Sequence, residues 1–200
     1  MILPMGYEHF LIFGSFMVAA WFLFIYFYPR MLLYVYKRAI LVKGFGEGPV
    51  PINTLYTESQ KLFADPLHAD ASTPNVATTG VNHDTLITIG CLDLSQGPQV
   101  LHVPDMAGRY YSVQFTNPSY NTNFAYVGKR TTGTEAGDFL ISGPGWQGMA
   151  PSGLAQISSP NNSVLVIGRV LVESDSDVST AYGLAKQIQL TPLSRWKPAQ

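Results

Sequence analysis

Residues 85–127, TLITIGCLDLSQGPQVLHVPDMAGRYYSVQFTNPSYNTNFAYV, decide the fold of this chain. Short β-branched or aromatic runs alternate with the turn clusters SQGP, DMAG and NPSYN, which is typical of strands joined by tight turns. Two similar runs follow, set off by TTGTEAG and GPGW. Their spacing predicts a mainly β fold, an antiparallel sandwich or an open barrel. The predicted strands are residues 85–92, 99–103, 110–116, 123–127, 138–142 and 163–172.

A short helix is predicted before these strands. Glycines and prolines at residues 44–51 indicate a hinge, and Asn53 or Thr54 is placed to cap a helix that follows it. Leu62 and Phe63 then supply an inward-facing apolar side.

A second helix is predicted to close the domain at residues 177–189, with Ser174 or Ser176 as its cap. Two prolines near the C-terminus then predict a tail. The chain therefore divides into an anchor with a juxtamembrane helix, a linker with a short helix, a β-rich domain and a tail. These four parts are residues 1–43, 44–79, 80–190 and 191–200.

The anchor is the run FLIFGSFMVAAWFLFIYFY at residues 10–28, which carries no charge. A helix needs about 20 apolar residues to cross a bilayer core. Trp21 and Tyr28 lie toward its C-terminal end, where an aromatic belt is expected. A buried core helix is disfavoured because the run is apolar on all sides. A cleaved signal peptide is disfavoured because the run is long and no Lys or Arg precedes it.

This helix is predicted to make the chain's contacts inside the membrane. Small residues let a second helix approach closely, and aromatic rings can touch lipid or pigment. We expect other membrane protein subunits and the lipid bilayer as partners, and no cofactor beyond lipid or pigment contacts along the helix. The predicted contact residues are Phe10, Phe13, Gly14, Ala20, Trp21, Phe24 and Tyr28.

Pro29 is expected to end or kink the helix. Two interpretations of residues 31–43 stay open: an amphipathic helix lying along the membrane interface, or an ordinary linker helix. In the first, apolar side chains face the lipid while cationic ones reach the head groups. The apolar set is Leu32, Leu33, Tyr36, Ile40 and Leu41, and the cationic set is Arg30, Lys37, Arg38 and Lys43.

The overall composition excludes several classes of function. The net charge is -1 and the pI is about 6.4, so the chain has no basic face for nucleic acid. Charged residues make up 12%, against about 25% in an average soluble protein, which fits a surface spent on lipid or partners. The single cysteine excludes a disulfide within the chain.

Residues 80–146 resemble the domain-of-unknown-function family 1254. A Pro-Arg pair after the helix, Pro29-Arg30, is shared with small membrane-anchored members of that family. Val81 departs from the pattern, since a proline is common there. The motifs that carry the resemblance are Asn82, Asp84 and Thr85, the run at 92–98, Arg109, Tyr110 and Tyr111, the loop at 128–133, residues 143–146 and the late strand Arg169.

The resemblance implies a β-rich fold, an envelope location outside the cytoplasm and no established reaction. Longer members often carry a second domain, which we expect this chain to lack. We therefore predict a single-pass protein of the cell inner membrane with its globular domain in the periplasm. The charge count opposes this, because four cations follow the helix and none precedes it, and the positive-inside rule would put the domain in the cytoplasm.

The weak catalytic candidates are His83, Asp84 and Arg109. A carboxylate next to an imidazole can act as a general base pair. The alternative is that the polar side chains before residue 85 bond to backbone and shape the entry to a strand. For Arg109 we expect a structural ion pair with Asp84 or Asp105.

Ligand-binding candidates lie on the loops and strands that follow. Tyr120 and Asn123 suit a hydroxylated, carbohydrate-like ligand. Lys129 and Arg130 stand in a glycine-rich loop that resembles a phosphate site, although no P-loop motif is present. Tyr110 completes this set.

No metal site is expected. The spacing of the available side chains matches no zinc or iron motif. The residues weighed for such a site are His68, His83, His102, Asp93 and Asp105.

Three functions remain open, and the sequence leans toward the first, which is not catalytic. The first is an accessory or scaffold subunit that stabilises a larger membrane complex, with photosynthetic and respiratory assemblies as natural hosts. The second is an envelope enzyme or small-ligand binder whose candidate residues converge in one pocket. The third is a lone membrane-tethered sensor.

Overall fold

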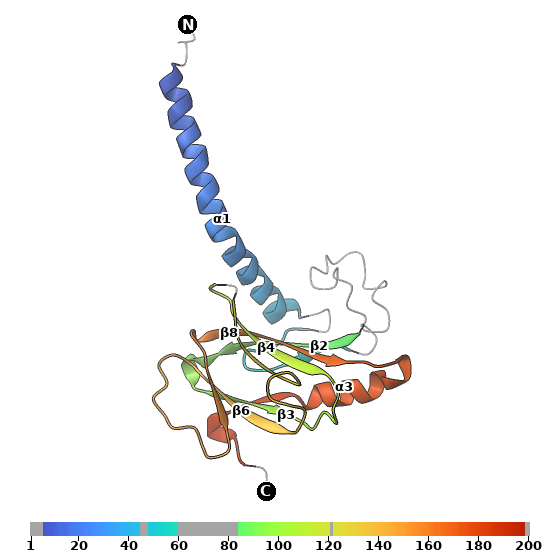
Figure 1. Cartoon of the computed structure of the whole chain (residues 1–200). Coiled ribbons are helices and arrows are strands. Elements are labelled where there is room, and N and C mark those ends of the chain that lie inside the picture. Colours follow the sequence, from blue (N-terminus) through green and yellow to red (C-terminus); the bar gives the residue numbers. More distant parts are fainter. Residues whose placement is uncertain (1–5, 45–47, 60–83, 121, 199–200) are drawn as a thin grey trace.

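The computed structural model describes residues 6–44, 48–59, 84–120 and 122–198. A long helix, α1, stands on a sandwich of two β-sheets (Figure 1). The predicted fold, mainly β with one apolar N-terminal helix and short flanking helices, is confirmed, and of the two predicted architectures the sandwich is the one that forms.

The first sheet has the strand order β1-β2-β8-β4-β5, and all its pairs are antiparallel. The second sheet has the order β7-β6-β3-β9, in which β6 and β7 run parallel and the other pairs antiparallel. The strands of the first sheet are Tyr56–Thr57 (β1), Thr85–Asp93 (β2), Ser163–Leu171 (β8), Tyr111–Asn117 (β4) and Thr122–Gly128 (β5). Those of the second are Ala155–Ser158 (β7), Gly137–Ser142 (β6), Gln99–Val103 (β3) and Gln189–Pro192 (β9).

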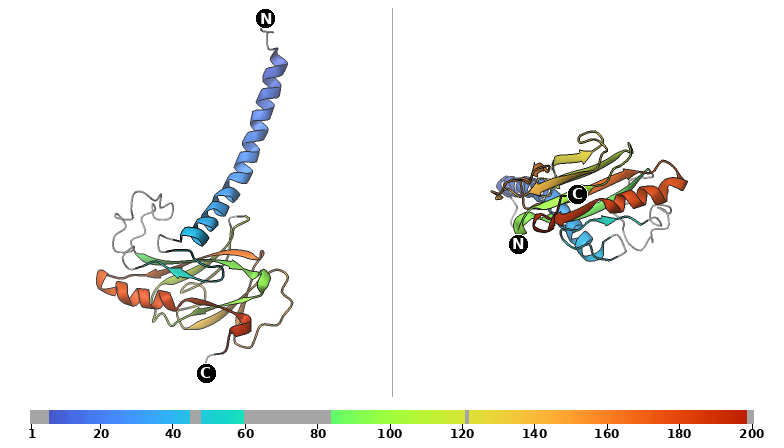
Figure 2. Two further views of the ribbon diagram at one scale, coloured as in Figure 1. Left: turned by 180° about the vertical axis from the view of Figure 1, so that it is seen from behind. Right: turned by 90° about the horizontal axis from the view of Figure 1, so that it is seen from below.

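The core lies between the two sheets. Alternate residues of each strand point into it, as the period of two requires. Phe115 and Val166 from the first sheet meet Leu101 and Ile141 from the second, and all four are fully buried. Burying a side chain of this size contributes about 1.5–3 kcal/mol, so this layer supplies most of the drive to fold. Figure 2 shows the two layers from behind and from below.

Helix α3, Val178–Gln187, packs against the first sheet through Ala181 and Ala185, which are fully buried. The predicted closing helix is therefore confirmed, with its ends shifted by one and two residues. The predicted caps are wrong. Ser174 and Ser176 bond to each other at 3.0 Å, and the residue before the helix makes no side-chain cap bond.

The short helix predicted after Asn53 does not form among the described residues 53–59, where Tyr56–Thr57 pair with β2 instead. The reason lies in the Asn53 side chain, which bonds to the end of β2 and so cannot cap a helix. Its amide oxygen accepts from the backbone N–H of Asp93 at 2.8 Å, and its Nδ2 donates to the Asp93 carbonyl at 3.2 Å. Leu62 and Phe63 lie outside the described residues.

The segment predicted as a tail is largely folded. Thr191 and Pro192 end β9, and a 3-10 turn, Leu193–Arg195 (η3), follows. Leu193 and Trp196 pack on Val100 and Leu140, and that apolar contact holds the segment in place.

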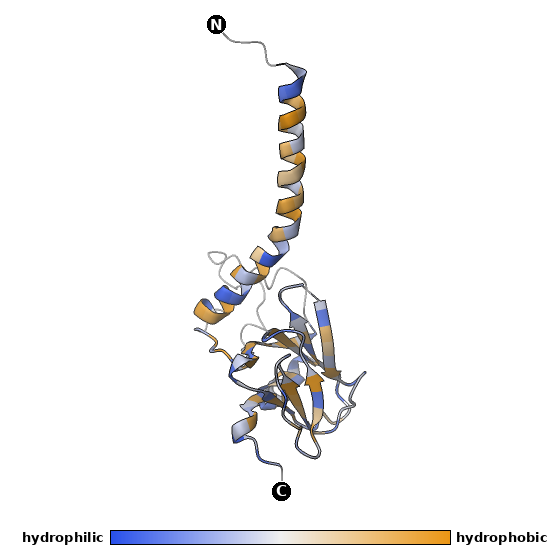
Figure 3. Cartoon of the chain, turned by 90° about the vertical axis from the view of Figure 1, so that its left-hand side faces the viewer, coloured by the Kyte–Doolittle hydropathy of each residue, from blue (hydrophilic) through white to orange (hydrophobic). Residues whose placement is uncertain are grey.

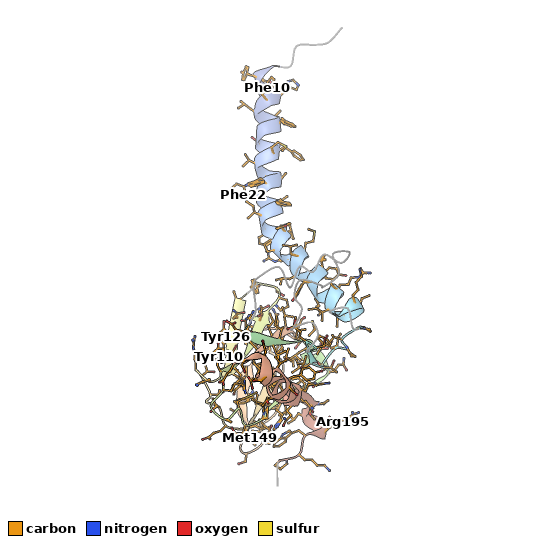
Figure 4. All side chains as sticks on the ribbon, turned by 90° about the vertical axis from the view of Figure 1, so that its right-hand side faces the viewer. Phe10, Phe22, Tyr110, Tyr126, Met149 and Arg195 are labelled. Atoms are coloured by element: carbon orange, nitrogen blue, oxygen red, sulfur yellow. The ribbon has the colours of Figure 1, made fainter. Side chains whose placement is uncertain are left out.

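Helix α1 spans Tyr7–Lys43 and continues through Pro29, so the proline does not end it. Its axis bends on the C-terminal side of Phe22 (Figure 4), and a proline inside a helix is the usual cause of such a kink. By length and hydropathy α1 can cross a membrane, and its most apolar window has no buried residue. Apolar colours dominate this N-terminal part (Figure 3).

The C-terminal part of α1 packs against the outer face of β2 and β8. Ile40 is 2% exposed and lies in one cluster with Val50, Ile89, Cys91 and Leu165. We call this cluster the docking seam.

The docking seam contradicts the first interpretation of residues 31–43, an amphipathic helix whose apolar side chains face lipid. Of the side chains expected at the membrane interface, Leu33, Tyr36, Ile40 and Leu41 lie against the domain, whereas Leu32 stays exposed. One predicted head-group cation, Lys37, also points inward and donates to Ser163 Oγ at 2.8 Å.

Candidate functional site

The outer face of the first sheet has two halves of different chemistry. One half, formed by β2 and the part of β8 around Leu165, is apolar and covered by α1 in the docking seam. The half toward β4 and β5 carries polar side chains and lies beside the helix. We call it the polar face; its residues are Ser112, Gln114, Thr116, Asn123, Tyr126 and Arg169.

A chain of hydrogen bonds orders the side chains of the polar face. Asn123 Oδ1 accepts from Gln114 Nε2 at 2.9 Å and from Thr116 Oγ1 at 2.7 Å, and Asn123 Nδ2 donates to the Tyr126 hydroxyl at 2.8 Å. A bulge between Phe115 and Thr116 shifts the register so that Thr116 faces Asn123. The network fixes these groups before any ligand arrives.

A pocket of about 330 Å³ opens on this face, within the size range of small-ligand sites. The Arg130 guanidinium lies 5.4 Å from the centre of the Tyr110 ring, close enough for a cation–π contact. The described lining residues include two arginines and no carboxylate, so the charged side chains of the lining are all positive. The polar lining of the pocket includes Tyr110, Ser112, Gln114, Tyr126, Arg130, Thr131 and Arg169.

The pocket gathers two of the predicted ligand-binding residues, Tyr110 and Arg130. Asn123 lies beside it through its bond to Tyr126. Lys129 does not line it, because its Nζ donates to the Gly108 carbonyl at 2.6 Å. Tyr120 is placed elsewhere, in the turn before β5, with its ring centre 6.0 Å from Cζ of Arg30.

Sequence reasoning missed Gln114 as a site residue, although a signal was present. Ser112, Gln114 and Thr116 alternate with apolar residues along β4, and this period of two indicates a polar outward face. The pocket also unites three stretches that carry the family resemblance, namely residues 110–111, residues 128–131 and Arg169.

The catalytic candidates do not join this pocket. His83 lies outside the described residues. Asp84 precedes β2, and its backbone carbonyl accepts from Val172 N at 2.7 Å. Neither Asp84 nor Arg109 lines the pocket. Asp105 accepts from the backbone N–H of Ala107 at 2.8 Å and shapes a turn.

The expected ion pair of Arg109 exists, but both predicted partners are wrong, since the partner is Asp177. Arg109 Nη2 lies 2.7 Å from Asp177 Oδ1, Nη1 contacts Oδ2, and Nη1 also donates to the Leu171 carbonyl at 2.7 Å. The bidentate bond lowers the pKa of Asp177 and raises the pKa of Arg109. This arginine ties the start of β4 to the start of α3.

A second carboxylate cluster lies on the second sheet. Asp138 Oδ1 is 2.7 Å from His102 Nδ1, and Trp196 Nε1 donates to Asp138 Oδ2 at 2.9 Å. The cluster ties the C-terminal segment to β3 and β6. Asp138 escaped sequence analysis, because only the register of those strands places it opposite His102. Within the part of the chain that is described, no three His, Cys, Asp or Glu side chains group to hold a metal.

Comparisons with known proteins find a family and one solved structure of similar fold, and they name no activity. The family model described as "Protein of unknown function (DUF1254)" matches residues 64–192. The crystal structure of the VPA0106 protein from Vibrio parahaemolyticus is similar with a TM-score of 0.62 and 24% identity. That match covers 88% of this chain and 40% of the Vibrio protein, so this chain spans about two fifths of its length.

An uncharacterised protein from Burkholderia cenocepacia matches with a TM-score of 0.41 and 13% identity, covering 72% of this chain and 36% of that one. No curated protein matches the sequence.

The Arg109–Asp177 pair predicts a pH-dependent stability. We expect Asp177→Asn to lower the free energy of unfolding at neutral pH by about 1–3 kcal/mol, because it leaves Arg109 without its charged partner. The folded-state pKa of Asp177 lies below its ordinary value, so the carboxylate stabilises the fold above about pH 4 and loses this effect as the pH falls through the lower value. The gap between wild type and variant should therefore close in acid.

Denaturation of the full chain in a neutral detergent, followed by circular dichroism, measures this gap. Asp175→Asn is the matched control, since it removes an exposed carboxylate two residues away. Equal loss in both variants, or a gap that stays constant into acid, would contradict the assigned pair.

Proposed function

The chain belongs to the DUF1254 family of proteins of unknown function, and we propose that it is a non-catalytic accessory subunit of a larger membrane protein complex. Its transmembrane helix would contact neighbouring subunits, and its β domain would stabilise them at the membrane surface.

The observation that carries this proposal is the difference between the two parts of α1, one packed on the domain and the other exposed. The C-terminal part is fixed to the domain through the docking seam. The N-terminal part is uncovered, with Phe10, Phe13 and Trp21 each more than 60% exposed. A helix that is rigidly joined to its domain transmits position, whereas a flexible tether would not. This arrangement suits a subunit that fixes the position of neighbouring subunits relative to its own domain.

The exposed part of α1 offers a surface that another helix can use. A shallow groove runs past Gly14, Ser15 and Ala19, between the larger Phe10 and Phe22. Small residues flanked by bulky ones favour close helix packing in lipid. On another side, the rings of Trp21, Phe24 and Tyr28 follow one another with centroids 6.1 and 5.0 Å apart, which suits lipid or pigment. A photosynthetic or respiratory host remains our preferred setting.

One observation favours a second candidate function, the binding of a small ligand. The polar face carries a pocket with ordered amide and hydroxyl groups beside two arginines. If this second candidate were an enzyme, Asp84 and Arg109 would have to lie in the same pocket as the tyrosines. Arg109 is engaged by Asp177 instead, so the pocket supports binding without supporting that catalytic set.

The accessory role predicts stoichiometric co-migration. Extraction from native membranes in mild detergent, followed by size separation, should find the chain with the subunits of one larger complex. Gly14→Leu should abolish co-migration while leaving the chain in the membrane, because it fills the groove with bulk and does not disturb the helix.

Ile12→Phe is the control, since it adds bulk outside the groove. A wild-type chain that runs alone at its own mass plus detergent would overturn the accessory role. Retention of Gly14→Leu in the complex would overturn the groove as its contact.

A periplasmic domain in the inner membrane predicts a defined labelling pattern. Met149 is 93% exposed, whereas the native Cys91 is 1% exposed, so Met149→Cys supplies one accessible thiol. A membrane-impermeant maleimide should label this variant in cells whose outer membrane has been permeabilised and whose inner membrane is intact. Labelling only after the inner membrane is permeabilised would place the domain in the cytoplasm, as the four cations that follow the uncharged run of residues 10–28 predict.

A further inference from the structure

We propose that the pocket on the polar face binds the phosphate group of an anionic membrane lipid through Arg130 and Arg169. This inference rests on the membrane anchoring in the proposed function and adds a ligand to the domain that the anchor carries.

The chemistry of the pocket selects an anion. Arg130 and Arg169 enter it from the turn after β5 and from β8 respectively. Two guanidinium groups line one space of about 330 Å³, and a phosphate bound there would offset their like charges. A guanidinium matches phosphate oxygens with two parallel N–H donors, so the pair favours phosphate over a diffuse negative surface.

These two arginines are available, in contrast to Arg109. Arg109 has its carboxylate within the fold. Among the described residues, no carboxylate lies within ion-pair distance of Arg130 or Arg169. The hydroxyl and amide groups of Ser112, Gln114 and Tyr126 line the same pocket and can bond the remaining oxygens of a phosphoglycerol group.

Arg30 marks the end of the apolar span next to the domain. It is the first charge after the uncharged run of residues 10–28, so the apolar span ends there. Its guanidinium lies 3.9 Å from the ring centre of Tyr26 on α1 and 6.0 Å from that of Tyr120 on the β4–β5 turn. The turn therefore stands at the end of the span, where tyrosine and arginine side chains meet lipid head groups.

The pocket lies on the outer face of the same sheet, toward the opposite end of the β4–β5 hairpin from that turn. β4 and β5 carry Gln114 and Tyr126 there. The first sheet is the layer nearer α1, and the second sheet lies on the far side (Figures 1 and 2). Tyr110 and Tyr126 lie closer to the helix than Met149 and Arg195 do (Figure 4). The pocket is thus on the side of the domain that faces the bilayer.

Free inorganic phosphate shares this chemistry, and the position of the pocket is what favours the lipid. A head group held at the surface by its own acyl chains is present at high local concentration, which a dissolved anion lacks. Screening by salt should weaken the contact, since both arginines are solvent-exposed.

The test is a titration of the full chain, released from a neutral detergent, by native mass spectrometry. The probes are short-chain phosphatidylglycerol, short-chain phosphatidylcholine and inorganic phosphate. We expect phosphatidylglycerol to bind about tenfold or more tightly than phosphatidylcholine, whose choline cation the two arginines repel. The double variant Arg130→Gln/Arg169→Gln should lose that preference.

Arg195→Gln/Lys197→Gln is the matched control, because it removes two exposed cations outside the pocket, and it should keep the preference. Equal binding of the two lipids, or a preference that survives in the pocket variant, would overturn the assignment. Complete displacement of phosphatidylglycerol by an equal concentration of inorganic phosphate would overturn the lipid as the ligand.

The outcomes separate this inference from the accessory role. A chain that migrates alone from native membranes but binds phosphatidylglycerol through the two arginines loses the accessory role and keeps the lipid site. A chain that co-migrates with a complex but shows no arginine-dependent preference keeps the role and loses the site.

Discussion

The packing of α1 on the outer face of β2 and β8 is the contact on which the rest of the structure depends. Ile40, Ile89, Cys91 and Leu165 bury one another there, at about 1.5–3 kcal/mol for each large aliphatic side chain that leaves water. The contact joins the long apolar helix to the domain. It also hides the apolar half of that face and leaves the polar half open beside the helix, where Arg30 meets Tyr120.

Two consequences follow for function. In the proposed arrangement, a domain packed on its membrane helix presents one side to the bilayer, and a pocket on that side would meet lipid head groups. The exposed part of α1 has a fixed orientation relative to the domain, so a neighbouring subunit bound to the helix is also held relative to the domain. The accessory role and the lipid site therefore draw on the same docking seam.

The sequence was a good guide to elements whose signal is local. The six predicted strands appear within one or two residues, because β-branched alternation and turn clusters mark both ends of each. The sequence did not predict β1, β7 and β9, because these strands are only two to four residues long. Each is a strand because it pairs with a partner strand that is distant in the sequence. The apolar stripe of Leu33, Tyr36, Ile40 and Leu41 was visible, but periodicity cannot tell a lipid surface from the protein's own sheet.

The candidate site shows the same difference between features with a local sequence signal and features that depend on long-range pairing. Alternating Ser112, Gln114 and Thr116 are readable from β4 alone, whereas Arg169 joins them only because β8 pairs with β4. Arg109 signalled an ion pair, but its carboxylate lies 68 residues away and comes near through the packing of α3. Long-range pairing decides both cases, and no local pattern encodes it.

The reactivity of the native Cys91 thiol tests the docking seam most directly. Burial beneath α1 blocks reagents and raises the pKa of the thiol, and both effects slow alkylation. In the full chain in neutral detergent, a maleimide that consumes free cysteine within minutes should leave Cys91 unmodified until denaturant unfolds the sheet, as followed by circular dichroism. Rapid labelling of Cys91 while the strand signal is intact would show that α1 does not cover β2 and β8, and would contradict the account at its centre.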